Sequence, residues 1–285
     1  MRSAGGRRTL LGVATFLAVA VIALILPAAL HAGRPDPATA FGPTAFPPVS
    51  PPVSSPTFTQ PYAPGSSTPP ATHPGPLRTS CSSLLYVGDS TSEGVVSIDY
   101  LPEPSDREDA RLRAVGVRTF IPEISGARAI VEHYKGQASG ADVVNRYVAQ
   151  GYRGCWIIAL GNNDAANMSV GGTPDAAGRI DMVMRRIGGQ KVLWVDTRTL
   201  VSTGPNAEPK MAAWDSALLG ACGRYPELRV YDWASEVRPD WYTHTDDIHY
   251  TTPGYRARSL GIARALANAF PASGAPQPGC TVTSR

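Results

Sequence analysis

The stretch from residue 84 to residue 94, LLYVGDSTSEG, decides the fold of this chain. Its apolar start, Leu84 to Val87, is followed at once by a glycine and a polar turn. A short apolar run without alternation is typical of a strand that is buried on both faces, as in a parallel sheet covered by helices. In such sheets the functional side chains lie in loops beyond the carboxyl ends of the strands. The polar turn from Gly88 to Gly94 is therefore the first place to look for chemistry.

The same pattern recurs along the rest of the chain. Further strands are predicted at Val117 to Ile121, Trp156 to Leu160, Val192 to Val195 and Arg229 to Tyr231. Segments of helical periodicity are predicted near Asp106 to Ala114, Gly140 to Gln150, Asp175 to Ile187, Pro209 to Ala221 and Pro253 to Ala269. Alternating strands and helices predict an α/β protein, a three-layer α/β/α sandwich around a five-stranded parallel sheet.

Composition divides the chain into three parts. An uncharged run from Thr9 to Leu30 follows three arginines, so residues 1–33 are predicted to be a cytoplasmic stub with a signal anchor or, less favoured, a cleaved signal peptide. Residues 34–78 hold 14 of the 27 prolines and are predicted to be a Pro/Ser/Thr-rich disordered linker. Residues 79–285 are left as the folded domain, which carries the polar turn after the first strand. This order predicts a domain outside the cytoplasm, in a bacterial cell envelope, anchored to the membrane or secreted after cleavage.

The charge of the folded part excludes one class of partner. Residues 81–285 carry 21 basic and 22 acidic side chains, so no nucleic-acid partner is expected. The sequence has neither a metal-ligand cluster nor a P-loop, which argues against phosphodiester or nucleotide chemistry and predicts no metal.

Four cysteines lie in the predicted domain: Cys81, Cys155, Cys222 and Cys280. An even number in an oxidising compartment predicts two disulfides, with free buried thiols as the alternative. The predicted topology gathers all four at the end of the sheet opposite the polar turns. Of the three possible pairings, we take Cys81 with Cys280 and Cys155 with Cys222 as the hypothesis.

Two further polar motifs accompany the turn after the first strand. The sequence GNND, residues 161–164, follows the third predicted strand, and DDIH, residues 246–249, precedes the last predicted helix. Each motif alone is a common turn or helix cap. Because all three would converge on one rim of the sheet, chance is a poor explanation for them together.

These motifs contain the groups of a nucleophilic serine site. The Ser90 hydroxyl needs a base, which His249 can supply, and a carboxylate to orient that base, which Asp246 can supply. Asp247 is the competitor for the last role, and spacing alone does not exclude it. The oxyanion that forms during attack on an ester needs preorganised donors. The Ser90 backbone N–H and the Asn163 side-chain amide are the candidates.

Three motifs resemble blocks I, III and V of the SGNH hydrolase superfamily, the GDSL-like esterases and lipases: GDS at 88–90, GNND at 161–164 and DDIH at 246–249. The resemblance covers residues 81–270. It implies a flavodoxin-like fold, a Ser/His/Asp triad without a cofactor, and an oxyanion hole formed by the Ser90 N–H, the Asn163 side chain and a glycine N–H. By position after the second predicted strand, that glycine is Gly126.

The predicted function is that of an exported serine esterase. It would hydrolyse or transfer short O-acyl groups, acetyl first, on cell-envelope glycans or glycolipids, through an acyl-Ser90 intermediate. Trp241, close to the third motif, is a candidate substrate contact. The expected partners are the acyl-ester substrate and, through the N-terminal helix, the membrane. The alternative is a catalytically weak glycan-binding module tethered in the cell wall, against which the presence of all three triad side chains argues.

Overall fold

The computed structural model describes residues 76–285. In this part of the chain one parallel sheet has the strand order β2-β1-β3-β4-β5-β6. Its strands are β1 (Ser83–Gly88), β2 (Thr119–Ile124), β3 (Cys155–Ala159), β4 (Val192–Val195), β5 (Leu228–Tyr231) and β6 (Thr281–Val282). The α-helices are α1 (Ser90–Val96), α2 (Glu108–Ala114), α3 (Gly140–Ala149), α4 (Asn162–Met168), α5 (Ala176–Ile187), α6 (Glu208–Ala221), α7 (Trp233–Glu236) and α8 (Thr252–Ala269). Short 3₁₀ helices are η1 (Pro104–Asp106), η2 (Tyr134–Gly136) and η3 (Pro239–Trp241).

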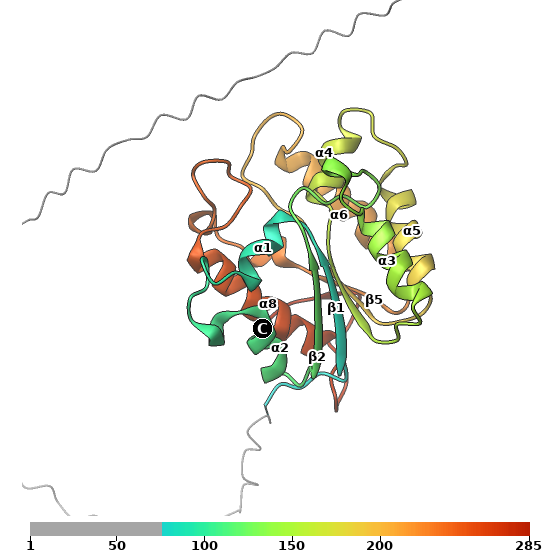
Figure 1. The fold of residues 1–285 in the computed structure, drawn as a ribbon, viewed down its shortest axis with the longest axis vertical. Coiled ribbons are helices and arrows are strands. Elements are labelled where there is room, and N and C mark those ends of the chain that lie inside the picture. Colours follow the sequence, from blue (N-terminus) through green and yellow to red (C-terminus); the bar gives the residue numbers. More distant parts are fainter. Residues whose placement is uncertain (1–75) are drawn as a thin grey trace, which may run out of the picture. The chain divides into compact units, whose positions relative to one another are not determined.

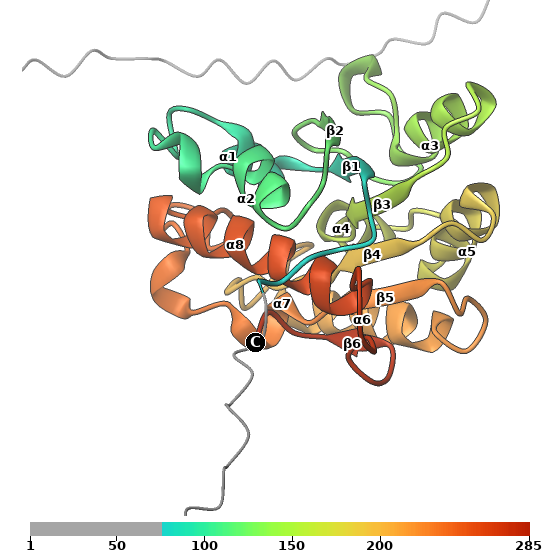
Figure 2. The same cartoon turned by 90° about the horizontal axis from the view of Figure 1, so that it is seen from below.

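Helices cover both faces of the sheet. Helices α1, α2 and α8 lie on one face, and α3, α5 and α6 lie on the other (Figures 1 and 2). Side chains of a strand point alternately to opposite faces. Accordingly Leu84 and Tyr86 of β1 belong to one apolar core, while Leu85 and Val87 belong to the second, and all four are fully buried. The predicted three-layer α/β/α sandwich is confirmed.

The five predicted strands are present, but the predicted strand count was wrong. A sixth strand, β6, pairs with β5 at the edge of the sheet. It has only two residues, too few for any apolar periodicity to reveal it. The second strand also begins two residues later than predicted and continues to Ile124. Helices α1 and α4 were not predicted either, since each has only seven residues and begins inside a polar motif.

Two disulfides are present, as predicted, but the predicted pairing was wrong. Cys81 is bonded to Cys155, and Cys222 is bonded to Cys280. The physical reason is the strand order. Strands β1 and β3 are neighbours, which brings Cys81 beside Cys155, whereas β6 extends the far edge and carries Cys280 away from β1 toward the end of α6.

The predicted membrane segment, residues 1–33, and most of the predicted linker, residues 34–78, lie outside the described residues. From residue 76 onward, none of the helices combines the length and the apolar character that crossing a bilayer requires.

Candidate active site

Ser90 lies where the chain leaves the sheet. It is the first residue of α1, directly after β1, and β1 has β2 on one side and β3 on the other. The carboxyl end of such a strand is a topological switch point, where ligands of parallel α/β sheets bind. The turn is held by Asp89, whose Oδ1 accepts hydrogen bonds from the Thr91 backbone N–H at 2.9 Å and hydroxyl at 2.7 Å. Asp89 therefore caps α1 and fixes the nucleophile turn.

The second motif lies at the end of β3. Gly161 has a φ of 148° and precedes α4, and a Cβ at this position would lie 2.3 Å from Trp214 Nε1. Only glycine fits this turn without strain or collision. The turn brings Asn163 toward β1, where its Nδ2 donates to the Arg128 carbonyl at 3.1 Å and to Asp89 Oδ2 at 3.4 Å. The first two motifs are thus in direct contact.

The third motif belongs to a loop that is closed at its base. Tyr242 and Tyr250, both buried, form an antiparallel bridge, and the Thr243 N–H donates to the His249 carbonyl at 2.8 Å. The Tyr250 hydroxyl accepts a hydrogen bond from Trp233 Nε1 at 2.9 Å. These buried aromatic contacts hold the loop in place, immediately before α8 begins.

The structure brings the three side chains of the predicted triad together. His249 Nε2 lies 2.8 Å from Ser90 Oγ, and His249 Nδ1 lies 2.6 Å from Asp246 Oδ2. Both distances are within hydrogen-bonding range. The imidazole can therefore accept the serine proton at one nitrogen while its other nitrogen is held by a carboxylate.

The Asp246 carboxylate is held in its ionised form. Partial burial acts to raise its pKa, but hydrogen bonds outweigh this effect and lower the pKa below the ordinary value. The donors are the His249 ring, the His249 and Ile248 backbone N–H groups, and the Thr243 hydroxyl. The three other donors bind Oδ1, so Oδ2 is left for the imidazole. An ionised carboxylate in this position can orient the imidazole and stabilise it when it becomes protonated.

The third predicted oxyanion donor, Gly126, lies in the segment between β2 and α3. This segment is tied to β1 because the Ser125 N–H donates to the Gly88 carbonyl at 3.1 Å. The Gly126 carbonyl accepts from Gln137 Nε2 at 2.6 Å, and a Cβ on Gly126 would lie 3.1 Å from Glu93 Oε1. Gly126 is therefore close to the nucleophile helix α1, which carries Glu93.

One buried ionic network near this site was not predicted. Arg179 of α5 is fully buried and binds Asp164 at 2.8 Å and Glu132 at 2.5 Å. Asp164 Oδ1 also accepts from the Ile130 N–H at 2.9 Å. The network fixes α4 against the segment after β2. The only sequence signal was Asp164 itself, since nothing in the spacing of Arg179 and Glu132 points to their pairing.

A second unpredicted residue is Arg258 of α8, which is buried beneath the site. Its guanidinium lies 5.2 Å from the centre of the Trp233 ring and 5.4 Å from that of Tyr250. Cation–π contacts of this kind stabilise a desolvated arginine. Arg258 therefore supports the two aromatic residues on which the histidine loop rests.

Trp241 has a different environment from the triad. Its ring stacks on that of Trp233, with 6.0 Å between centroids, and lines a cavity of about 170 Å³ next to α8 whose walls include none of the triad residues. Its role in substrate binding stays a prediction.

Between residues 76 and 285, no three His, Cys, Asp or Glu side chains are grouped as metal ligands.

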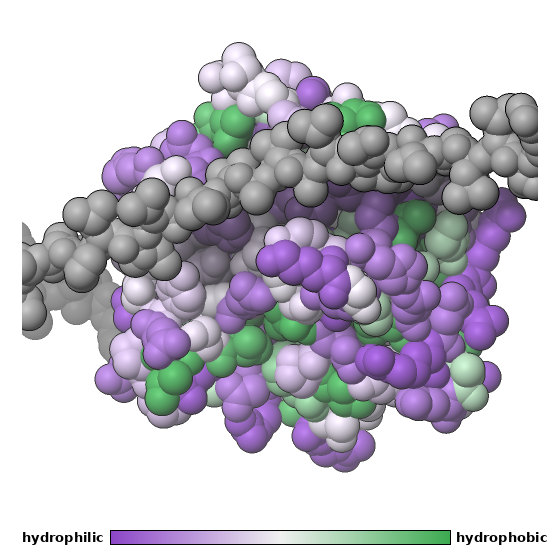
Figure 3. Space-filling view, turned by 45° about the horizontal axis from the view of Figure 1, so that its top comes forward, coloured by the Kyte–Doolittle hydropathy of each residue, from purple (hydrophilic) through white to green (hydrophobic). Residues whose placement is uncertain are grey.

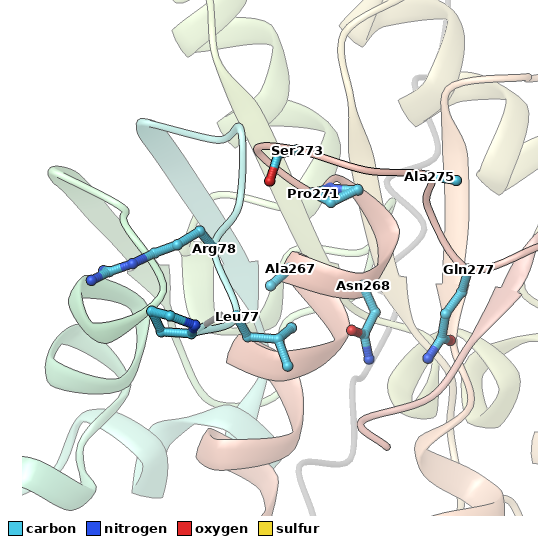
Figure 4. Close-up of a pocket in the computed structure, with 9 residues that line it drawn as sticks. Leu77, Arg78, Ala267, Asn268, Pro271, Ser273, Ala275 and Gln277 are labelled. Carbon is cyan, nitrogen blue, oxygen red and sulfur yellow. The ribbon is translucent and has the colours of Figure 1, made fainter. Parts of the chain in front are cut away.

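Another cavity, of about 350 Å³, lies at the other end of α8. Its walls include Leu77, Arg78, Ala267 and Asn268 (Figure 4). Helix α8 begins beside His249 and rises about 1.5 Å per residue, so this cavity is roughly 20 Å from the triad.

Figure 3 shows one face of the domain, on which hydrophobic residues are scattered among hydrophilic ones and form no single large patch in the visible part.

Comparison with known proteins supports the fold. No family model and no curated protein matches the sequence. A lipase/acylhydrolase from Enterococcus faecalis is 17% identical, covers 68% of this chain and 99% of its own, and has a TM-score of 0.51. A carbohydrate acetylesterase from Sinorhizobium meliloti is 17% identical over 66% of this chain and 99% of its own, with a TM-score of 0.48. An aryl esterase from M. smegmatis is 21% identical over 63% of this chain and 95% of its own, with a TM-score of 0.49.

The match to the first of these structures has a TM-score above 0.5 and extends over nearly all of that protein's chain, so it supports the described fold. In the present chain that fold carries a serine, a histidine and an aspartate in hydrogen-bonding order. This arrangement is consistent with a hydrolase acting on ester bonds. The chain therefore has an α/β/α fold like that of this lipase/acylhydrolase, and it carries three motifs that resemble those of the SGNH hydrolases.

Proposed function

We propose that this protein is an exported serine esterase that removes short acyl groups, acetyl first, from cell-envelope glycans or glycolipids. The single observation that carries the proposal is the continuous chain of hydrogen bonds from Ser90 Oγ through both ring nitrogens of His249 to Asp246. A binding module would gain nothing from a polarised serine, whereas ester cleavage requires one.

The proposed reaction begins with attack of Ser90 Oγ on the ester carbonyl carbon. His249 Nε2 takes the hydroxyl proton as the Oγ–C bond forms, and the carbonyl π electrons move to the oxygen. His249 then donates that proton to the leaving alcohol oxygen as the C–O bond breaks, which leaves an acyl-Ser90 ester. A water molecule, deprotonated by His249, attacks this ester and releases the acid. A sugar hydroxyl in place of water would give transfer instead of hydrolysis.

The proposed oxyanion hole consists of the backbone N–H groups of Ser90 and Gly126 and the side-chain amide of Asn163. In the resting site the Asn163 amide already donates to two oxygens, and the contact with Asp89 at 3.4 Å is the longer one. A hydrogen bond of that length is weak. We expect the developing oxyanion to share the hydrogen of this longer contact, while the shorter bond to the Arg128 carbonyl keeps the amide in place.

The extracytoplasmic location is part of the proposal. Two disulfides in the described domain support it, since such bonds persist in oxidising compartments. The short acyl group is likewise part of the proposal.

The test is covalent labelling of Ser90. The purified full chain is treated with a fluorophosphonate probe, and its intact mass is compared with that of Ser90→Ala. We expect one adduct in the parent and none in the variant, followed by turnover of p-nitrophenyl acetate by the parent alone. A folded parent that forms no adduct would contradict the esterase proposal and favour the glycan-binding module.

A further inference from the structure

A cavity of about 330 Å³ has Asn163 in its wall. It is lined by Ala127, Glu132, His133, Tyr134, Asn163 and Asn167. From this lining we infer that the cavity binds the sugar ring of the ester, its polyhydroxylated alcohol part, and not the acyl chain. The inference rests on the proposed esterase function and adds a substrate class and a set of binding residues to it.

The cavity shares Asn163 with the candidate active site. Asn163 belongs to its wall, and the same side chain reaches Asp89, the residue before the nucleophile. The volume falls at the lower end of the range of about 300–1,000 Å³ that is usual for small-molecule sites. A sugar ring held here would present an esterified hydroxyl to the region between Asn163 and Ser90.

Glu132 is a preorganised acceptor for sugar hydroxyls. Arg179 binds both of its carboxylate oxygens, at 2.5 and 2.6 Å, and is itself fully buried and held by Asp164. Partial burial acts to raise the pKa of Glu132, but the hydrogen bonds from Arg179 lower it below the ordinary value. Its side chain is still 35% exposed. Each oxygen of an ionised carboxylate can accept a further hydrogen bond, which a hydroxyl group can donate.

The two lining residues that follow Glu132 offer a fixed ring nitrogen and an aromatic ring. His133 Nε2 lies 2.6 Å from Asp142 Oδ2, and Asp142 also forms the capping box of α3 with Ser139. The imidazole is therefore held by the end of a helix, with Nδ1 at its other side. Tyr134 is 49% exposed, so part of its ring is open to solvent. Aromatic rings pack well against the C–H faces of a sugar, while their polar groups stay in water.

The chemistry of this wall disfavours an acyl chain. An alkyl chain would remove water from the Glu132 carboxylate, the His133 ring and the Asn167 amide without replacing those hydrogen bonds, which costs free energy. Sugar hydroxyls replace the water partners one for one. The cavity thus selects the alcohol side of the substrate, and the acyl group is left on the other side of the Ser90 turn.

The experiment compares two esters that share an acetyl group and differ in the alcohol. The full chain is assayed for kcat and KM on partially O-acetylated oligosaccharides of glucose and of xylose, and on p-nitrophenyl acetate. The variants are Tyr134→Ala and Asn167→Ala. Tyr134→Phe keeps the ring, and Leu219→Ala changes an exposed residue of α6 outside the cavity.

We expect Tyr134→Ala and Asn167→Ala to lower kcat/KM on the sugar esters relative to p-nitrophenyl acetate by about tenfold, mainly through KM, as loss of ground-state binding predicts. Leu219→Ala should keep the parent ratio, and Tyr134→Phe, which keeps the ring, should lower it less than Tyr134→Ala does. An unchanged ratio in both alanine variants would overturn the inference. So would a parent that cleaves p-nitrophenyl acetate but neither sugar ester, in which case the esterase proposal stands. A parent without adduct or turnover would instead remove the esterase proposal.

Discussion

Asp246 Oδ2 lies 2.6 Å from His249 Nδ1, although Asp247 is one residue closer to this histidine in the sequence. The backbone of the loop decides between the two carboxylates. Asp247 has a φ of 59° and donates its N–H to the Thr243 carbonyl, and its own carbonyl accepts from the Leu200 N–H. This left-handed residue turns the chain so that Asp246, and not its neighbour, faces the imidazole.

The two aspartates should therefore differ sharply on substitution. Asp246→Asn keeps the shape of the side chain but removes the negative charge that stabilises the protonated imidazole. We expect kcat on p-nitrophenyl acetate to fall by about 10²–10⁴-fold, by comparison with aspartate loss in other triads. Asp247→Asn, which tolerates a left-handed backbone, is the matched control and should retain kcat within about twofold. Equal losses in both variants would contradict the assignment.

Asn163 should affect turnover more than substrate binding. Asn163→Ala removes one oxyanion donor, and loss of such a donor costs about 10²–10³-fold in kcat. KM on p-nitrophenyl acetate should change little, because the hydrogen bond is strong only in the transition state. Labelling of Ser90 by a fluorophosphonate should slow in parallel. A variant with raised KM and parental kcat would instead place Asn163 in ground-state binding.

The disulfides should stabilise the domain without taking part in the chemistry. They close sequence separations of 74 and 58 residues. In the chain-entropy account each is worth about 4 kcal/mol. The double variants Cys81→Ser/Cys155→Ser and Cys222→Ser/Cys280→Ser should each lower the urea midpoint of unfolding, with kcat near that of the parent below the transition.

Peptide mapping without reduction gives a direct check of the pairing. It should recover the linked pairs Cys81–Cys155 and Cys222–Cys280. Recovery of any crossed pair, such as Cys81 with Cys280, would contradict the strand order that we describe.

Asp215 of α6 should make stability fall as pH rises. Burial raises its pKa from 3.8 to about 7, against the lowering effect of hydrogen bonds from the Thr197 N–H and hydroxyl. The folded protein therefore binds more protons than the unfolded chain between these two values, and the free energy of unfolding decreases with rising pH in that window. The effect of this group is at most about 4 kcal/mol.

Asp215→Asn is the variant for this prediction, because its side-chain oxygen can still accept both hydrogen bonds from Thr197. Urea unfolding at pH 5 and pH 8 should show a smaller loss of stability in the variant than in the parent. The nearby Asp196 also has a raised pKa, caused first by burial and then by the Asp215 charge, so part of the slope should remain. A parent that gains stability from pH 5 to pH 8 while the variant does not would contradict the prediction.

The elements that the sequence predicted are those with local signals. The four-residue apolar run of β4 was predicted to the residue, because buried parallel strands consist almost wholly of apolar residues. Helix α5 was predicted within one residue from its periodicity. The two-residue strand β6 gave no such signal, and without it Cys280 was assigned to the wrong partner.

The sequence by itself determined the fold class and the candidate groups Ser90, Asn163 and His249, since strand burial and turn chemistry are local properties of the chain. Only the tertiary structure decided how distant groups pair. The backbone of one loop places Asp246, and not Asp247, beside His249. The strand order determines the two disulfide pairs, and the packing of α5 pairs Arg179 with Glu132. Such contacts join residues far apart in the sequence or depend on one left-handed residue, and neither leaves a periodic pattern that composition or spacing can reveal.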